Sequence, residues 1–297
     1  MDTKFLLVTL MLFALSVTSP GCNRSNDVAG GSGLLEADEV IVSAEATGRV
    51  ESIRFGEGSQ VEEGDTLLII DPSRLELELE SALAGQRVAQ AGLQTADLQL
   101  EKARESERFA GAERDRIASL VKSGTATQKR LDQLEHEYAM AELGQRTSRA
   151  NISAIEAELT KIEADMNRIR RQIQDCYPVA PMKGTVTEKL VEKGELLAPG
   201  KPIAKISRLD TLWVKVYLPT ADFAGIKVGD KATVDTEAGG KQYGGEVVWT
   251  SEEAEFTPKN VQTRKSRTNL VYAAKVRVAN SDGHLKIGMP VFVTIEK

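Results

Sequence analysis

Histidine and cysteine, which often bind metals or act in catalysis, are few in this sequence of 297 residues, and they lie far apart. The chain has two histidines, His136 and His284, and two cysteines, Cys22 and Cys176. Their separations do not match the short spacings of metal ligands. No Ser/His/Asp or Cys/His arrangement stands out, and no phosphate-binding glycine loop precedes a predicted helix. We therefore expect neither an enzyme nor a protein with a bound metal or cofactor.

Lys183 is a further residue whose context suggests chemistry. It follows Met182, and this Met-Lys pair is similar to the modified site of biotinyl carrier domains. In those domains the lysine lies on a tight hairpin between two similar halves. Met182 and Lys183 instead stand at the start of the second of two similar segments. That position disfavours a biotinyl or lipoyl carrier, which stays an alternative.

Residues 1–21 have the pattern of an export signal. Lys4 precedes an apolar run, Phe5–Val17, that is too short to cross a bilayer core of roughly 30 Å. The Ser-Pro-Gly-Cys sequence that ends at Cys22 resembles the lipobox of bacterial lipoproteins. The resemblance implies that Cys22 carries lipid and anchors the protein in the periplasm, at the outer face of the inner membrane. Residues 22–35 are polar and rich in Gly and Ser, so we expect a flexible tether there.

Two similar segments, residues 46–71 and 182–207, stand on either side of a long insertion. Glycines divide each segment into short alternating stretches, which is typical of strands joined by tight turns. Each segment is too short to bury a core alone, so we expect the two to pack together. The pattern resembles a lipoyl-like domain, here split between residues 36–72 and 178–207. At one constant offset, Gly48, Val50, Gly58, Gly64 and Ile70 correspond to Gly184, Val186, Gly194, Gly200 and Ile206.

The inserted residues, 73–177, have the spacing of a coiled coil. Apolar residues recur at alternating intervals of four and three, and no proline occurs between Pro72 and Pro178. Between the two halves, Gly124 can end one helix and Thr127 can cap the next. The pattern predicts an antiparallel helical hairpin that is roughly 70 Å long. The first apolar run is Leu75, Leu79, Ala82, Ala89, Leu93, Ala96, Leu100, Ala103, Ala110, Ile117 and Val121, with lapses at Gln86, Glu107 and Arg114. The second is Leu131, Leu134, Tyr138, Ala141, Ile152, Ile155, Leu159, Ile162, Met166, Ile169 and Ile173, with lapses at Gln145 and Ser148.

Residues 208–297 have the pattern of a small β-barrel. Short alternating stretches are separated by Gly and Asp turns. Pro219–Asp222 is typical of a turn or helix start, and one short helical turn is expected at Asp222–Gly229. The fold class is therefore α+β: an elongated chain with a long helical hairpin inserted into a split lipoyl-like β-domain, followed by a small β-barrel. The predicted barrel strands are Thr211–Leu218, Lys231–Val234, Gly245–Thr250, Val271–Val278 and Met289–Ile295.

Composition agrees with this organisation and excludes one class of partner. The 38 Lys and Arg residues against 44 Asp and Glu give a net charge of −6, which excludes a dedicated nucleic-acid binder. Aromatic residues make up only 5% of the chain. A long seam of Ala, Leu and Ile explains this low value, because a two-helix coiled coil needs no aromatic side chains.

The organisation resembles the HlyD-type membrane fusion proteins, the periplasmic adaptors of bacterial efflux and secretion systems. The resemblance covers nearly all of residues 36–297. It implies two partners, an inner-membrane transporter and a TolC-like outer-membrane channel, and a ring of copies, with six usual in the family. In that family the hairpin tip carries an Arg-x3-Leu-x6-Ser motif that packs against the channel. Arg116, Leu120 and Thr127 match this motif, with Thr127 in place of Ser.

The class of transporter is indicated by the end of the chain. Residues Glu255–Thr263, with Arg267 and Thr268, look like the barrel segment of adaptors that serve ABC-type exporters. The sequence also stops at the last barrel strand, without the membrane-proximal domain common in adaptors of proton-driven RND exporters. We therefore expect an ABC-type partner. An RND partner and a purely structural coiled-coil lipoprotein remain the alternatives, although the second leaves the lipoyl-like repeat unexplained.

Overall fold

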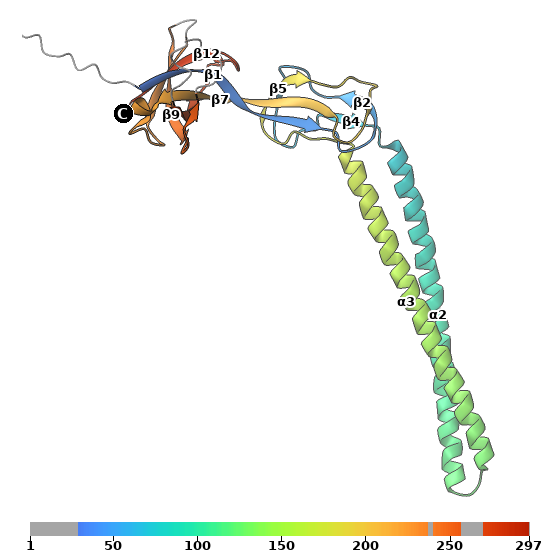
Figure 1. The fold of residues 1–297 in the computed structure, drawn as a ribbon. Coiled ribbons are helices and arrows are strands. Elements are labelled where there is room, and N and C mark those ends of the chain that lie inside the picture. Colours follow the sequence, from blue (N-terminus) through green and yellow to red (C-terminus); the bar gives the residue numbers. More distant parts are fainter. Residues whose placement is uncertain (1–28, 237–239, 257–269, 297) are drawn as a thin grey trace, which may run out of the picture. The chain divides into compact units, whose positions relative to one another are not determined.

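The computed structural model of the chain describes residues 29–236, 240–256 and 270–296. They form two compact units, one made of residues up to 40 and from 206 onward, the other of residues 41–205. The long strands β1 (Ala29–Ser43) and β7 (Pro202–Pro219) connect the two units (Figure 1). The expected export signal and Cys22 lie outside the described residues.

The first unit is a closed β-barrel. Its strands follow one another in the order β7-β11-β9-β8-β12-β1, and β1 returns to β7, so that each of these strands has two neighbours. A dense core of Val, Leu and Ala side chains fills the interior. The remaining elements of this unit are β8 (Lys231–Thr236), β9 (Gln242–Thr250), β10 (Glu255–Phe256), β11 (Leu270–Ala279), β12 (Pro290–Ile295) and the short helix α4 (Thr220–Phe223).

Strand β1 corrects the expected tether. Residues 29–35 were expected to be flexible, but they pair with β12 from Ala29 opposite Ile295 to Leu34 opposite Pro290. Residues 36–40, expected in the lipoyl-like domain, also belong to the barrel unit. The physical reason is that the barrel needs this strand, since without β1 the edges of β12 and β7 would stay unpaired.

The glycines of β1 serve close packing rather than flexibility. A Cβ atom on Gly33 would lie 2.5 Å from Cγ2 of Val214 and 2.6 Å from the carbonyl oxygen of Lys215. The backbone of β1 therefore approaches β7 more closely than any larger residue allows. A Gly-rich stretch in a sequence can indicate either a flexible linker or close backbone packing. The tertiary contacts of β1 show close packing.

The helix start predicted at Pro219–Asp222 is confirmed, but the helix does not continue through the expected range Asp222–Gly229. Helix α4 covers Thr220–Phe223 and ends before Gly225, which has a φ of 100°. That left-handed conformation cannot continue a right-handed helix. The barrel strands, by contrast, overlap their predicted positions.

The second unit contains the two similar segments, and their packing confirms the repeat. The turn glycines of each half donate to the other half: Gly58 N–H to Val186 O at 2.8 Å, and Gly194 N–H to Val50 O at 2.9 Å. All of the turn glycines have φ between 83° and 90°. The strands are β2 (Gly48–Ile53), β3 (Gln60–Val61), β4 (Leu68–Ile70), β5 (Gly184–Lys189) and β6 (Leu196–Leu197), with β2 paired to β6 and β3 to β5 across the halves.

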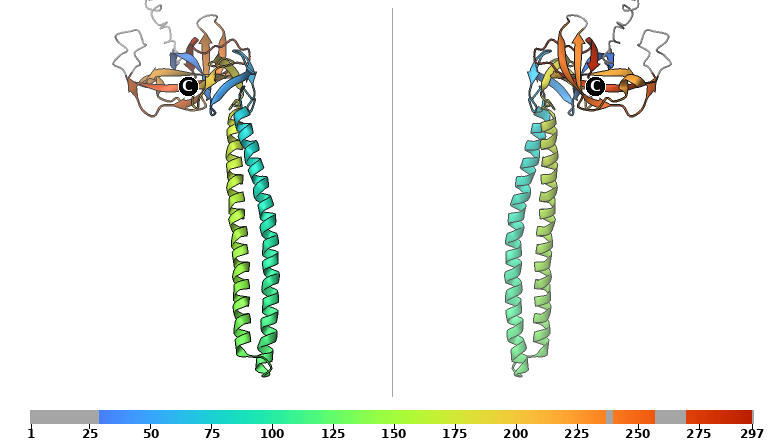
Figure 2. Two further views of the ribbon diagram at one scale, coloured as in Figure 1. Left: turned by 90° about the vertical axis from the view of Figure 1, so that its right-hand side faces the viewer. Right: turned by 90° about the vertical axis from the view of Figure 1, so that its left-hand side faces the viewer.

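The inserted hairpin consists of helix α2 (Ser73–Lys122) and helix α3 (Gln128–Asp175), which run antiparallel side by side (Figure 2). Every residue of the predicted seam is buried or partly buried, which confirms the coiled-coil pattern. The polar lapses, such as Gln86 and Gln145, are also partly buried and lie in the same seam. Full burial is rare, and in the two helices it is reached by Ala96, Leu100, Leu134, Met166 and Ile169.

Polar contacts fix the base of the hairpin. Asp71 accepts hydrogen bonds from the Ser73 N–H at 3.0 Å and from the Ser73 hydroxyl, at the start of α2. These bonds lower the pKa of Asp71. At the end of α3, Arg171 forms ion pairs with Asp175 at 3.0 Å and with Glu45 at 3.4 Å. Polar contacts to residues outside the helices are thus present at the start of α2 and at the end of α3.

Candidate functional site

The hairpin tip is a tight, hydrogen-bonded loop between α2 and α3. Gly124, with a φ of 77°, follows the C-cap residue Ser123. The N–H of Gly124 donates to Val121 O at 3.0 Å, and the N–H of Thr125 donates to Leu120 O at 2.9 Å. These two bonds form a Schellman motif, which satisfies the last carbonyls of the helix. The expected role of Gly124 as a helix terminator is confirmed.

The three predicted docking residues are all exposed at this tip. Arg116 and Leu120 are one helical turn apart on α2, so they share a face. The side chain of Arg116 is 69% exposed and forms an ion pair with Glu113 at 3.2 Å, while Leu120 is 40% exposed. The structure therefore presents an apolar side chain and a guanidinium together.

Thr127 stands at the N-cap position of α3, as the sequence predicted, but its side chain makes no capping hydrogen bond. Its φ and ψ, −91° and 147°, are those of an extended N-cap residue. The expectation that the hydroxyl caps the return helix is therefore wrong. The loop has a different side-chain bond, at the end of α2: the hydroxyl of Thr125 donates to Leu120 O at 3.1 Å.

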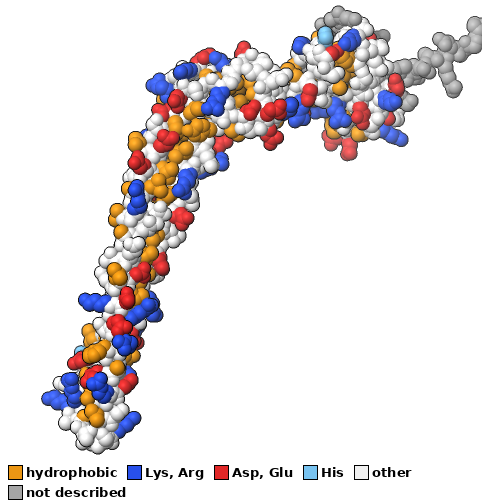
Figure 3. Space-filling model, turned by 180° about the vertical axis from the view of Figure 1, so that it is seen from behind, with side chains coloured by type: hydrophobic (Ala, Val, Ile, Leu, Met, Phe, Trp, Pro, Cys, Tyr) orange, Lys and Arg blue, Asp and Glu red, His pale blue; other side chains and the backbone are white. Residues whose placement is uncertain are grey.

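Apolar side chains are exposed along the hairpin away from the tip (Figure 3), and several of them belong to α2. Leu77, Val88, Leu98 and Phe109 are between 67% and 74% exposed, and they recur every ten or eleven residues. This spacing is close to three helical turns, so the four side chains lie near one line on the helix. On α3, Met140 and Leu143 are similarly exposed, at 55% and 51%.

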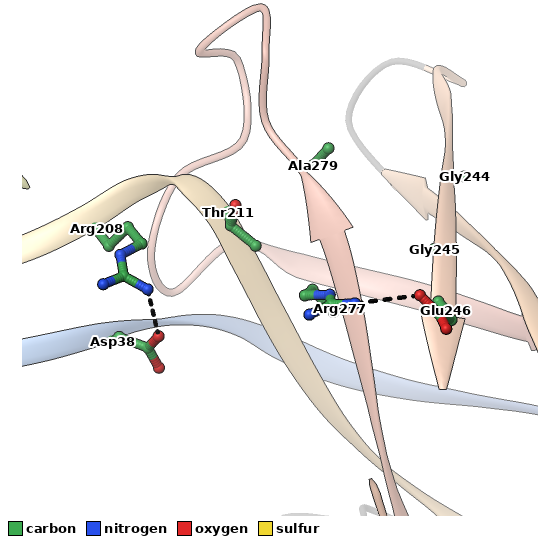
Figure 4. Close-up of a pocket in the computed structure, with 8 residues that line it drawn as sticks. All are labelled: Asp38, Arg208, Thr211, Gly244, Gly245, Glu246, Arg277 and Ala279. Atoms are coloured by element: carbon green, nitrogen blue, oxygen red, sulfur yellow. Dashed lines mark hydrogen bonds and ion pairs between the residues drawn. The ribbon is translucent and has the colours of Figure 1, made fainter. Parts of the chain in front are cut away.

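The barrel carries a shallow hollow that the sequence did not predict. It has a volume of about 500 Å³, and small residues, Gly244, Gly245 and Ala279, form part of its lining. Two ion pairs stand over it (Figure 4): Arg277 with Glu246 at 3.2 Å, and Arg208 with Asp38 at 3.6 Å. Strand alternation places Arg277 on the outer side of β11, but its cross-strand neighbours, Glu246 of β9 and Trp213 of β7, come from distant parts of the sequence that no local pattern reveals.

The residues considered for chemistry lie apart in the structure. Lys183, the potential carrier lysine, binds Glu62 Oε1 at 2.7 Å just before β5. Cys176 is buried at the end of α3, and burial raises the pKa of its thiol. His284 Nδ1 lies 3.5 Å from Asp282, on a barrel loop. Within the described ranges, no group of three or more His, Cys, Asp or Glu side chains is arranged to hold a metal ion.

The family model described as "RND MFP, barrel-sandwich hybrid domain" matches residues 38–207, more than half of the chain. The chain belongs to the membrane fusion protein family. Members of this family are periplasmic adaptors and not enzymes. The matched range covers both lipoyl-like segments and the hairpin between them, which confirms the resemblance at the level of the family.

Curated relatives agree with this family. A UPF0194 membrane protein of Acidithiobacillus ferridurans is 28% identical over 293 residues, covering 89% of this chain and 85% of the relative. The UPF0194 membrane protein YbhG of Salmonella gallinarum is 28% identical over 289 residues, covering 88% of this chain and 86% of the relative. No helix in the described part of this membrane fusion protein is long and apolar enough to span a bilayer.

Solved structures show the same fold. MacA from Actinobacillus actinomycetemcomitans superimposes with a TM-score of 0.62 at 20% identity, covering 91% of this chain and 79% of that chain. A MacA–MexA chimera carrying the α-hairpin of Pseudomonas aeruginosa MexA gives a TM-score of 0.55 at 21% identity, covering 91% and 81%. The combination of barrel, lipoyl-like domain and hairpin is thus the family's own architecture.

Proposed function

We propose that this membrane fusion protein links an inner-membrane exporter, of ABC type, to a TolC-like outer-membrane channel for efflux. The observation that carries the proposal is the exposed hairpin tip at the end of a helix pair that extends from the family's barrel-sandwich domain. Helix α2 has 50 residues and is therefore roughly 75 Å long. A rigid arm of this length suits a contact with a partner far from the β-domains.

We propose that the tip docks on the channel through Arg116, Leu120 and Thr127. Leu120 supplies an exposed apolar side chain, and Arg116 has donors beyond those that its exposed pair with Glu113 occupies. The Schellman loop holds the backbone around Leu120 in one conformation. A preorganised tip loses little conformational entropy when it binds.

We further propose that copies assemble side by side into a ring, in which α2 of one copy meets α3 of the next. Phe109 on α2 and Met140 on α3 lie at a similar distance from the tip, because Tyr138 packs beside Gly111. A rotation axis along the hairpins would bring these exposed apolar side chains together. Near the base, the exposed acids of α2, such as Glu76, would face the exposed arginines of α3, such as Arg170.

The lipid anchor at Cys22 completes the proposal. It is supported by the likeness of the residues before Cys22 to a lipobox and by relatives that are named membrane proteins. The ABC class is supported by the sequence of Glu255–Thr263, most of which lies outside the described residues, and by the fold likeness to MacA, an ABC-type adaptor. An RND partner is the second candidate, which the description of the matching family model favours.

Photocrosslinking in intact cells tests these contacts. A photoreactive residue at position 120 should capture an outer-membrane channel, and one at position 109 should capture a second copy of this chain. Leu120→Ala should reduce channel capture through a neighbouring probe, whereas the adjacent exposed Ser119→Ala should not, with unchanged helical circular dichroism in both. Mass spectrometry of the inner-membrane protein recovered with the complex decides between ABC and RND partners. Capture of soluble proteins alone at position 120 would contradict channel docking.

A further inference from the structure

Both tryptophans of the chain lie on one outward face of the barrel. Trp213 on β7 and Trp249 on β9 flank strand β11, which pairs with both of these strands. In the register, Lys275 of β11 stands opposite Trp249 on one side and opposite Lys215 of β7 on the other. The face therefore alternates aromatic rings with ammonium groups.

The rings and the ammonium groups are in contact. Lys275 Nζ lies 4.1 Å from the centre of the Trp213 ring and 6.0 Å from that of Trp249. Lys215 Nζ lies 5.0 Å from the Tyr217 ring and 6.0 Å from Trp249. These are cation–π distances. We name Trp213, Lys215, Tyr217, Trp249 and Lys275 the Lys–Trp patch.

The patch places two like charges next to each other on the barrel surface. Lys215 and Lys275 carry like charges directly opposite each other on neighbouring strands, which destabilises a sheet. Both residues lie outside the barrel core, so they contribute little to it. Lys215 stays charged, since its hydrogen bond to Tyr217 and the nearby carboxylate of Glu255 raise its pKa. Trp249 is 42% exposed, although a buried tryptophan contributes more to the free energy of folding.

The patch continues into the hollow on the same face. Arg277 follows Lys275 on β11 and stands opposite Trp213 in the register. Its guanidinium points to Glu246, which follows the small residues Gly244 and Gly245 in the lining of the hollow (Figure 4). The two arginines of the hollow have exposed ion pairs that contribute little to stability and are easily exchanged for another anion. Patch and hollow together thus contain three aromatic rings and four cationic groups. Lys275 faces the rings, whereas Lys215 pairs with Glu255 at 3.4 Å and the two arginines pair with Glu246 and Asp38.

The start of β1 places this face near the proposed anchor. Cys22 is seven residues before Ala29, so an extended chain between them spans at most about 25 Å. The glycines at the start of β1 lie against the backbone of the patch: a Cβ on Gly31 would be 3.2 Å from Tyr217 O, and one on Gly33 would be 2.6 Å from Lys215 O. A lipid on Cys22 would therefore keep the patch within one short tether of the bilayer.

We infer that the Lys–Trp patch docks on the headgroup layer of an anionic phospholipid membrane. This inference rests on the proposed lipid anchor, which would keep the patch close to the bilayer. Trp and Tyr rings favour the membrane–water interface, where the ring is in apolar surroundings and the polar group is hydrated. Lys215, Lys275 and Arg277 bind the lipid phosphates, and clustered cations near anionic lipids add their attractions. Docking fixes which face of the barrel is turned to the membrane.

The two tryptophans make the inference directly measurable, because both of the chain's tryptophans belong to the patch. The full-length protein, purified with its lipid, is reconstituted into vesicles of phosphatidylcholine with or without phosphatidylglycerol. Brominated phosphatidylcholine quenches tryptophan that reaches the headgroup–acyl boundary. We expect a loss of emission in vesicles with phosphatidylglycerol, and much less loss in phosphatidylcholine alone.

Matched charge variants test the residues. Lys215→Glu with Lys275→Glu should abolish the quenching, whereas Lys231→Glu with Lys286→Glu, which changes two exposed lysines of the same unit, should preserve it. Lys215→Gln with Lys275→Gln removes the positive charges without adding negative ones, and it should cause a partial loss of the quenching. The unchanged melting temperature of each variant shows that the barrel is folded.

The outcomes separate the patch from the anchor. Protein that sediments with vesicles but shows no quenching overturns the patch and leaves the adaptor proposal intact. Equal quenching without phosphatidylglycerol overturns the role of anionic headgroups. A change in emission that needs inner-membrane proteins, and not vesicles, assigns the patch to a protein partner instead. If mass spectrometry finds no lipid on Cys22, quenching by added phosphatidylglycerol vesicles still supports the patch, and its absence overturns it.

Discussion

The hairpin and the barrel bury apolar side chains in different ways. In the barrel, a closed ring of strands surrounds its core, so Leu212, Val214, Val216 and Leu218 along β7 are all fully buried. In the hairpin, each helix covers only one side of the other, and most seam residues stay partly exposed. The hairpin thus gains less from each apolar residue, and its stability is spread along its length.

This difference fits the two proposed roles. A thin helix pair leaves its outer faces available for contacts, as with Phe109 and Met140, while its length carries the tip away from the lipoyl-like domain. A closed barrel gives a fixed surface on which the cross-strand neighbours of Lys275 are held in register. Apolar side chains that are buried within the chain are not available for partners, so the two uses compete.

The largest expected effect compares two leucines. Leu218→Ala in the barrel removes a fully buried side chain, and we expect a loss of about 2–5 kcal/mol in unfolding free energy. Leu79→Ala in the partly buried seam should cost roughly half as much. Denaturant unfolding measures both, with tryptophan fluorescence for the barrel and helical circular dichroism for the hairpin. Equal losses would mean that the seam is covered by something beyond α3.

A pair of glycines sharpens the comparison. Gly33→Ala should destabilise the barrel by about 1–3 kcal/mol, because the new Cβ would overlap Val214 and the Lys215 carbonyl. Gly85→Ala, in open space on α2, should stabilise the hairpin by about 0.5–1 kcal/mol, because alanine is the better helix former. Thermal melts followed by the same two signals check both. A tolerated Gly33→Ala would argue that β1 is a flexible segment after all.

The smallest effect concerns acid stability. Asp282 accepts hydrogen bonds from Lys241, from the His284 N–H and from Tyr243, and these bonds hold its pKa well below the usual range. The folded-state pKa is depressed, so this carboxylate stabilises the barrel above about pH 4 and loses its effect as the pH falls through the folded pKa. Asp282→Asn should therefore lower the barrel's melting temperature slightly at neutral pH and leave it unchanged in strong acid. The hairpin signal serves as the internal control.

The sequence predicted the hairpin almost completely, because its structure depends on local spacing. Helical periodicity identified the seam from Leu75 to Ile173, and Gly124 marked the turn, since only a left-handed conformation ends the helix there. The repeat was also visible, because Gly58 and Gly194 must adopt positive φ in equivalent turns. Residues close together in the sequence determine these features.

The barrel's closure was missed for the opposite reason. Residues 29–35 are rich in Gly, which lowers local strand propensity, and their pairing partner Pro290–Ile295 lies at the other end of the chain. The helical turn was predicted at Asp222–Gly229 but lies at Thr220–Phe223, because several start points were compatible with the local pattern. Thr127 was placed correctly, but its hydrogen bonding depends on a loop geometry that the residue type does not specify.

By itself, the sequence determined the α+β class, the hairpin, the split repeat and the exposed tip with Arg116 and Leu120. Tertiary structure alone decided that β1 closes the barrel and that the glycines of β1 allow close packing against β7. It also decided that Lys215, Lys275 and both tryptophans share one face. The physical reason is the range of the interactions. Turns and helix periodicity arise from residues a few positions apart, whereas strand register joins segments that only the folded chain brings together.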